Sequence, residues 1–125
     1  MAGTTSGVSI SKNGSDIDIV LYQGKTINFE VIWGGTTPIN VTGFSARMQA
    51  RQAASATAIL AEFSNSNGRI SVGNSNGKFI ISMSAADSAL LKAAVGVYDF
   101  EIVDTAGNVN LVMSGKFQIE PEVTK

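Results

Sequence analysis

The chain of 125 residues contains neither cysteine nor histidine. The absence of cysteine excludes disulfide bonds and thiolate metal sites. The absence of histidine removes the commonest general base and the commonest metal ligand. Zinc, iron or copper would have to bind through carboxylates alone, which these metals do not favour. We therefore expect no metal ion and no cofactor.

Charge is also scarce. Nine basic and ten acidic residues leave a net charge of -1, and charged residues make up only 15% of the chain. No cluster of lysine and arginine marks a surface for nucleic acid or an anionic membrane, so neither partner is expected. So little charge gives weak protection against association. Two interpretations stay open: a surface buried in an assembly, or simply a low charge.

Export signals and long apolar runs are absent as well. The first residues, MAGTTSG, have neither the basic nor the apolar segment of a signal peptide. No apolar run approaches the roughly 20 residues that a membrane-spanning helix needs. We therefore expect a chain that is made in a cytoplasm and has no membrane partner.

Alternation of apolar and polar residues is the main positive signal, and it is longest between residues 79 and 120. This region predicts, in order, a strand at 79–83, a helical turn at 84–95, a strand at 97–103, a turn at 104–108 and a strand at 109–119. Ser84 followed three residues later by Asp87 resembles a capping box, and Gly96 is expected to end the helix. A helix this short is expected to bridge two strands at a crossover.

Further strands are predicted upstream at 17–22, 26–33, 44–51 and 58–63, with Trp33 in the core. Two similar segments follow, each with an Asn-Gly pair, Asn67-Gly68 and Asn76-Gly77. Asn-Gly favours type I′ hairpin turns, so these segments predict a three-stranded meander. About eight short strands with frequent turns indicate an all-β sandwich or barrel. We interpret residues 17–125 as a single antiparallel β-sandwich domain.

Residues 1–16 are rich in Gly, Ser, Thr and Asn, with Val8 and Ile10 as the only large apolar residues after Met1. Such a composition is typical of a flexible arm. The alternation around Val8 and Ile10 also fits a strand that adds to the sheet edge of another subunit. The arm is therefore expected either to stay unstructured or to order on a neighbour.

Charged residues at alternate positions are the candidate site residues. Arg47 and Arg51 share one face of a predicted strand, and Asp99 and Glu101 share one face of another. A carboxylate pair can hydrolyse glycosides, but positions on the same face of one strand do not oppose their carboxyl groups across a substrate. The serines lack a histidine partner. We expect no enzyme and no small-molecule substrate. The candidate interface residues are Val8, Ile10, Arg47, Arg51, Asp99 and Glu101.

Several blocks of the sequence resemble one family, and they cover roughly residues 17–125. They are DIVLYQGKTINFEVIW at 18–33, Pro38 with VTGFSARMQAR at 41–51, NGRI at 67–70, VYDFEIV at 97–103, and Gly115 with PEVTK at 121–125. This pattern is similar to small virion proteins of tailed bacteriophages that are associated with tails, baseplates and fibres, including the N-terminal domain of baseplate upper proteins. The long N-terminus and NLVM at 110–113 depart from the pattern.

The resemblance implies an immunoglobulin-like sandwich that docks other phage structural proteins in the virion. It implies a non-enzymatic structural role in a tail fibre or baseplate, in a symmetric homo-oligomer. A capsid decoration protein is a second structural interpretation. A carbohydrate-binding receptor module is an interpretation of another class, with Trp33, Tyr22 and Tyr98 as stacking platforms.

Overall fold

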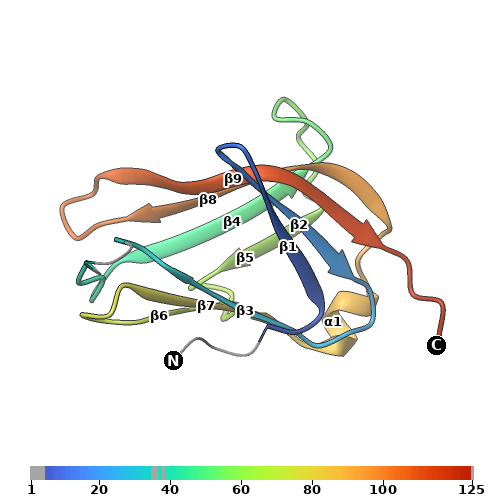
Figure 1. Ribbon diagram of the computed structural model, residues 1–125, viewed down its shortest axis with the longest axis horizontal. Coiled ribbons are helices and arrows are strands. Elements are labelled where there is room, and N and C mark those ends of the chain that lie inside the picture. The colour runs from blue at the N-terminus through green and yellow to red at the C-terminus, as the bar shows by residue number, and fades with distance from the viewer. Residues whose placement is uncertain (1–4, 35–36, 38, 125) are drawn as a thin grey trace.

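The computed structural model describes residues 5–34, 37 and 39–124, and its regular structure is almost wholly strands in two sheets (Figure 1). The strands are β1 (Val8–Asn13), β2 (Asp16–Tyr22), β3 (Ile27–Ile32), β4 (Ser45–Arg51), β5 (Ala61–Ser64), β6 (Ile70–Val72), β7 (Lys78–Met83), β8 (Ala94–Val103) and β9 (Val109–Glu120), with one helix, α1 (Ala85–Ala89). The six-stranded sheet has the order β1-β2-β9-β8-β4-β5, and the three-stranded sheet has the order β3-β7-β6. The prediction of an all-β architecture is confirmed. Residues 1–4, 35, 36, 38 and 125 lie outside the described residues, and so do the parts of the predicted arm, loop and family blocks that fall on them.

Strand pairing is antiparallel with one exception. β2 runs parallel to β9, with Ile19 opposite Phe117 and Tyr22 opposite Glu120. The prediction of a purely antiparallel sandwich is therefore wrong at this pair. The two strands are joined by the whole of the intervening chain, so no hairpin turn imposes an antiparallel direction on them.

The core lies between the two sheets and is built on phenylalanine. Five phenylalanines are fully buried, two from the smaller sheet and three from the larger one: Phe29, Phe79, Phe63, Phe100 and Phe117. The rings of Phe79 on β7 and Phe100 on β8 pack edge to face with their centroids 5.6 Å apart, so they form a direct contact between the two sheets. The alternation predicted for β4 is confirmed, since Ala46, Met48 and Ala50 point into this core.

Trp33 packs against the core beside Phe44, with the two ring centroids 6.1 Å apart. The core prediction for Trp33 is therefore confirmed only in part, since the side chain is half-buried at the margin of the core. A tryptophan ring that packs in this way contributes apolar burial to the fold.

The helix is shorter than predicted. Its N-cap is confirmed, because the Ser84 hydroxyl accepts a hydrogen bond from the backbone N–H of Asp87 at 3.1 Å. The helix ends at Ala89, however, and Gly96 lies inside β8. Pairing of β8 with β9 begins at Ala94, so residues with helical propensity are in the sheet instead of the helix. Gly96 serves a different purpose there, since a Cβ on it would lie 2.1 Å from the backbone oxygen of Arg51.

The N-terminal segment also differs from its prediction. Residues 8–13, expected to be part of a flexible arm, form β1 and pair with β2 from Val8 opposite Leu21 to Asn13 opposite Asp16. Gly14, with a φ of 65°, makes the two-residue turn that joins the strands. Backbone pairing and the packing of Val8 against the core compensate for the low hydrophobicity of the segment.

The Asn-Gly segments do not form the predicted meander. β5 belongs to the larger sheet, whereas β6 and β7 pair in the smaller one, so the chain changes sheets at the first segment. Among the described residues only glycines have positive φ, including Gly68 and Gly77, so neither turn is of type I′. The side-chain oxygen of Asn67 explains the difference, because it accepts from the backbone N–H of Ser64 at 2.9 Å and of Arg69 at 3.0 Å.

Tyr98 spans the larger sheet from inside the core. Its hydroxyl donates to the backbone oxygen of Ile17 on β2 at 2.5 Å, and its ring packs edge to face against Phe117 at 5.9 Å. Burial raises the pKa of Tyr98 above the ordinary value of a tyrosine, and the nearby carboxylates of Asp18 and Asp16 raise it further. Tyr98 is therefore held neutral in the folded protein.

This neutral Tyr98 should make the protein lose stability in alkali. A tyrosine in the unfolded chain titrates near pH 10, whereas the folded protein holds the pKa of Tyr98 above that. Below about pH 10 Tyr98 stays protonated in both the folded and the unfolded state, so its contribution to stability is constant. Above about pH 10 the unfolded state has released more protons than the folded state. The free energy of unfolding should therefore fall by up to about 1.4 kcal/mol per pH unit. Urea unfolding of the protein and of Tyr98→Phe between about pH 9 and 11 measures this. Parallel pH profiles for the two proteins would contradict the expectation.

Candidate functional site

Eight side chains on the outer surface of the larger sheet form the candidate site, which we call the β4–β8–β9 face. They are Arg47, Gln49, Arg51, Val97, Asp99, Glu101, Leu111 and Ser114. The strand register brings them together, because Arg47 lies opposite Glu101 and Gln49 opposite Asp99 across β4 and β8. On the other side of β8, Ser114 and Leu111 lie opposite Asp99 and Glu101. On β4 and β8 these positions alternate with buried residues, so they face outward. On β9 a register shift lies between Leu111 and Ser114, and each of these residues lies opposite an outward-facing residue of β8.

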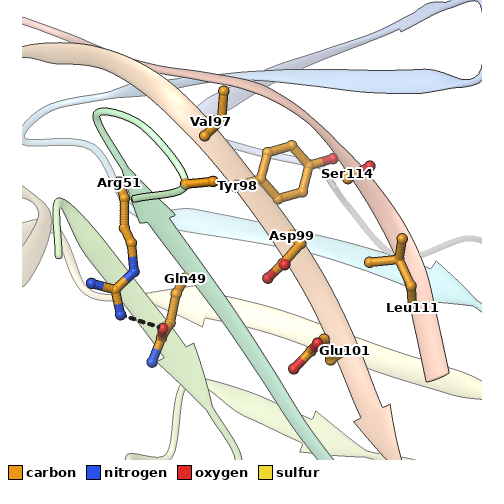
Figure 2. Close-up of a pocket in the computed structure, with 9 residues that line it drawn as sticks. Gln49, Arg51, Val97, Tyr98, Asp99, Glu101, Leu111 and Ser114 are labelled. Carbon is orange, nitrogen blue, oxygen red and sulfur yellow. Dashed lines mark hydrogen bonds between the residues drawn. The ribbon is translucent and has the colours of Figure 1, made fainter. Parts of the chain in front are cut away.

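A hydrogen-bonded network fixes most of the polar groups on this face. The Nε of Arg47 donates to Glu101 at 2.9 Å. The Nη2 of Arg51 donates to the Gln49 side-chain oxygen at 2.9 Å, drawn as the dashed line in Figure 2. Gln49 in turn donates to Glu62 on β5 at 2.7 Å. The face is therefore largely preorganised, which lowers the entropy lost when a partner binds.

Arg51 also holds a loop against the sheet. Its Nη1 donates to the backbone oxygens of Ala56 at 3.1 Å and Thr57 at 2.7 Å. The loop between β4 and β5 is thereby anchored beside the face, and Ala54 from this loop lines the same hollow as Arg51.

Asp99 differs from its neighbours, because its carboxylate has no hydrogen-bond donor within the described part of the chain. It lines a hollow of about 430 Å³ together with Arg51, Val97 and Leu111 (Figure 2). The pKa of the Asp99 carboxyl is raised, chiefly by burial and then by the Glu101 carboxylate, while Arg47 and Arg51 act in the opposite direction. Asp99 is thus an acceptor that an incoming N–H or ammonium group would satisfy.

Exposed aliphatic side chains flank Asp99. Val97 is 40% exposed and continues on β8 with Val95, on one side of Asp99. Leu111 is 60% exposed and continues on β9 with Val109, on the other side. Outward-facing aliphatic side chains on either side of an exposed carboxylate are a composition expected of a contact surface, where apolar burial provides affinity and the polar group provides specificity.

The geometry gives no support to catalysis by the two carboxylates. Asp99 and Glu101 project from one strand, and Glu101 is already paired with Arg47. In the described ranges, no group of three or more acidic residues is arranged to hold a metal ion. No helix among the described residues is both long and apolar enough to cross a membrane.

The structure brings together four of the six residues predicted for an interface. Arg47, Arg51, Asp99 and Glu101 all belong to the β4–β8–β9 face. Val8 and Ile10 do not, because β1 is separated from β8 by β2 and β9, and Val8 packs against the core. The side chain of Val8 is thus partly used in folding, and a role for Val8 at an interface stays a prediction.

Sequence reasoning missed four residues of this face: Gln49, Val97, Leu111 and Ser114. For Gln49 and Val97 the alternation along their strands already contained the signal, since they fall between the charged positions. Leu111 was hidden, because β9 carries a register shift opposite Phe100 and Glu101 that breaks its alternation.

Comparison with known proteins adds no relative. No protein-family model matches the chain, and no curated protein matches its sequence. The structure therefore defines an all-β, sandwich-like protein with an ordered polar network and exposed aliphatic side chains on one face. A more particular assignment has to be argued from the residues themselves.

Proposed function

We propose that this chain is a non-enzymatic structural protein of a tailed-bacteriophage virion, which docks tail-fibre or baseplate components through protein–protein contacts. The sequence blocks at 18–33, 41–51 and 97–103 resemble proteins of that class. The observation that carries the docking role is the β4–β8–β9 face, with its ordered polar network, its exposed Asp99 carboxylate and its exposed aliphatic side chains.

The strand order supports an immunoglobulin-like module, as the resemblance implies. In such modules strands B, E and D form one sheet and strands G, F, C and C′ form the other. β3-β7-β6 and β9-β8-β4-β5 follow these two orders, and the letters then run in chain order from β3 to β9. Two features are different: the pair of cysteines is absent, and the β1–β2 hairpin extends the larger sheet beside β9.

The face also specifies the chemistry of the docked partner. An aliphatic or aromatic side chain of the partner would cover Val97 and Leu111, and a lysine, arginine or amide would donate to Asp99. Because Asp99 is exposed, this contact mainly contributes specificity to the complex. The partner is therefore a protein surface with one cationic or amide group beside an apolar side chain.

Two of the three aromatic residues proposed to stack on a carbohydrate have side chains that pack against or within the core. Trp33 packs against the core and Tyr98 is buried, while Tyr22 is 38% exposed and bonds through its hydroxyl to Ser9. Stacking on a sugar needs an exposed aromatic face. Docking of a protein is the function that the exposed residues favour.

Placing a charge on the contact face should prevent incorporation into the virion. We expect Leu111→Glu to lower the amount of this protein in purified phage particles at least tenfold, because a buried, unpaired carboxylate costs several kcal/mol and about 1.4 kcal/mol already corresponds to a factor of ten. Leu90→Glu is the matched control, since Leu90 is 81% exposed beyond the end of α1 and away from this face. Quantitative mass spectrometry of purified particles gives the measurement.

Cryo-electron microscopy of the same particles locates the protein. Density in the tail or baseplate supports the proposal, whereas density at regular positions on the capsid would replace it with the decoration role. Absence of the protein from purified particles, or equal incorporation of Leu111→Glu and Leu90→Glu, would refute docking through this face.

A further inference from the structure

β1 forms one open edge of the larger sheet. It is six residues long, and five of these are exposed. No proline lies in it, and Lys12 is its one charged residue. Natural edge strands are commonly protected from pairing by prolines, bulges, short length or several charges. β1 has little of this protection.

The backbone of β1 directs alternate hydrogen-bonding groups away from the molecule. Tyr22 donates its backbone N–H to the oxygen of Gly7 at 2.9 Å, so the odd-numbered residues are the ones that bond to β2. Hydrogen-bonded and non-bonded pairs alternate along an antiparallel ladder. The N–H and C=O groups of Val8, Ile10 and Lys12 therefore point to the open edge.

The opposite edge of the same sheet is closed by the chain's own side chains. On β5 the backbone N–H of Ser64 donates to Asn67 at 2.9 Å. The backbone oxygen of Glu62 accepts from Asn67 at 3.2 Å and from Arg69 at 3.0 Å. β5 is also only four residues long. A strand added at this edge would have to displace these side chains.

The edges of the smaller sheet are also limited. At β3, Ser6 and Asn28 exchange two backbone hydrogen bonds of 2.8 and 3.0 Å, which occupies the edge at that position. β6, at the other edge, has three residues. Among the strands in the described part of the chain, β1 therefore offers the longest uncovered edge.

We propose that β1 pairs antiparallel with β1 of a second copy, so that the two larger sheets join across a two-fold axis. The axis passes beside Ile10, which faces its own counterpart, while Val8 faces Lys12 of the other copy. This register uses all three residues whose backbone groups point outward, and each hydrogen-bonded pair exchanges two bonds. Shifting the register by two residues loses one such pair, and a shift of four toward Lys12 places two lysines opposite each other, which is unfavourable.

Side-chain chemistry agrees with this pairing. Ile10 is 41% exposed in the single chain and would lie against a second Ile10 in the pair. β-Branched residues opposite each other are favourable cross-strand partners. The interface is small, so we expect a dimer that dissociates on dilution. The β1 pairing gives a structure to the homo-oligomer that the proposed function expects, but the argument for the pairing rests only on the geometry of β1.

Single cysteines test the register directly, because the chain has none of its own. In Ile10→Cys the two Cα atoms would lie about 5.5 Å apart, within the range that a disulfide bridges. We expect Ile10→Cys to form a covalent dimer under mild oxidation. Ser11→Cys is the matched control, since Ser11 would face Ser9 of the other copy and should stay largely monomeric. Equal cross-linking of the two variants, or none with Ile10→Cys, would overturn the proposal.

Sedimentation of the cysteine-free chain measures the unlinked dimer. Over a concentration series the protein should change from monomer to dimer, and Ile10→Lys should remain monomeric because it places two like charges face to face. Ser11→Lys adds the same charge opposite a serine and should still dimerise. A monomer at every concentration refutes the pairing without bearing on the β4–β8–β9 face, since β2 lies between β1 and the strands of that face.

Discussion

Replacing Phe100 with alanine should lower the free energy of unfolding by about 3–5 kcal/mol. Phe100 is fully buried at the centre of β8, and its ring meets that of Phe79 on the opposite sheet at 5.6 Å. The truncation removes apolar burial, leaves a cavity and breaks an aromatic contact between the sheets at once. A small domain has a total stability of about 5–15 kcal/mol, so this variant should be close to unfolding.

Urea denaturation followed by circular dichroism measures the change. Val97→Ala is the control on the same strand, because Val97 faces outward and is 40% exposed. We expect it to cost less than about 1 kcal/mol. A double-mutant cycle with Phe79→Ala should show a coupling of about 0.5–1.5 kcal/mol from the ring contact. If Phe100→Ala is no more destabilising than Val97→Ala, the two sheets do not share the core described above.

Gly115→Ala should destabilise the protein by about 1–3 kcal/mol, although it adds only one methyl group. A Cβ at this position would lie 2.4 Å from the backbone oxygen of Ile17 and 2.8 Å from a carboxylate oxygen of Asp18. Both groups are already used, since Ile17 accepts from Tyr98 and Asp18 accepts from the backbone N–H of Lys116 at 3.0 Å. The methyl group must therefore push β2 away from β9 and break these bonds.

Hydrogen exchange identifies where the damage occurs. In Gly115→Ala the amides of β2 and of residues 117–120 should lose protection, while β3 and β7 in the other sheet should keep theirs. Ser114→Ala is the control, because Ser114 is the adjacent residue on the outward face. An unchanged protection pattern together with unchanged stability would show that β2 and β9 are not packed as closely as described.

The strands were largely predictable, because alternation is a local signal that burial fixes. β4 is the clearest case: its buried Ala46, Met48 and Ala50 and its outward Arg47, Gln49 and Arg51 follow directly from a period of two. The helix cap at Ser84 is equally local. The same periodicity placed Asp99 and Glu101 on one face, so half of the candidate site was visible in the sequence.

Features that depend on distant parts of the chain were not predictable. The Asn-Gly segment at Asn67 looks like a hairpin, yet its side chain bonds locally and the chain passes to the other sheet. The extent of α1 was overestimated because helix propensity says nothing about the pairing of Ala94 with Ile119. β1 has too few apolar residues to signal a strand, and only the register of β2 shows that it pairs.

The parallel ladder between β2 and β9 has a consequence for biosynthesis. A ribosome releases residues 16–22 long before residues 117–120, so the early hairpin cannot take its place in the sheet until residues 117–120 have emerged. Two further contacts then join the same parts of the chain. The side-chain oxygen of Gln23 accepts from the backbone N–H of Glu122 at 2.9 Å, and Lys25 forms an ion pair with the Glu122 carboxylate at 3.0 Å. Such long-range closure slows folding and leaves nascent chains exposed to one another, because the sheet stays incomplete until residues 117–120 are available.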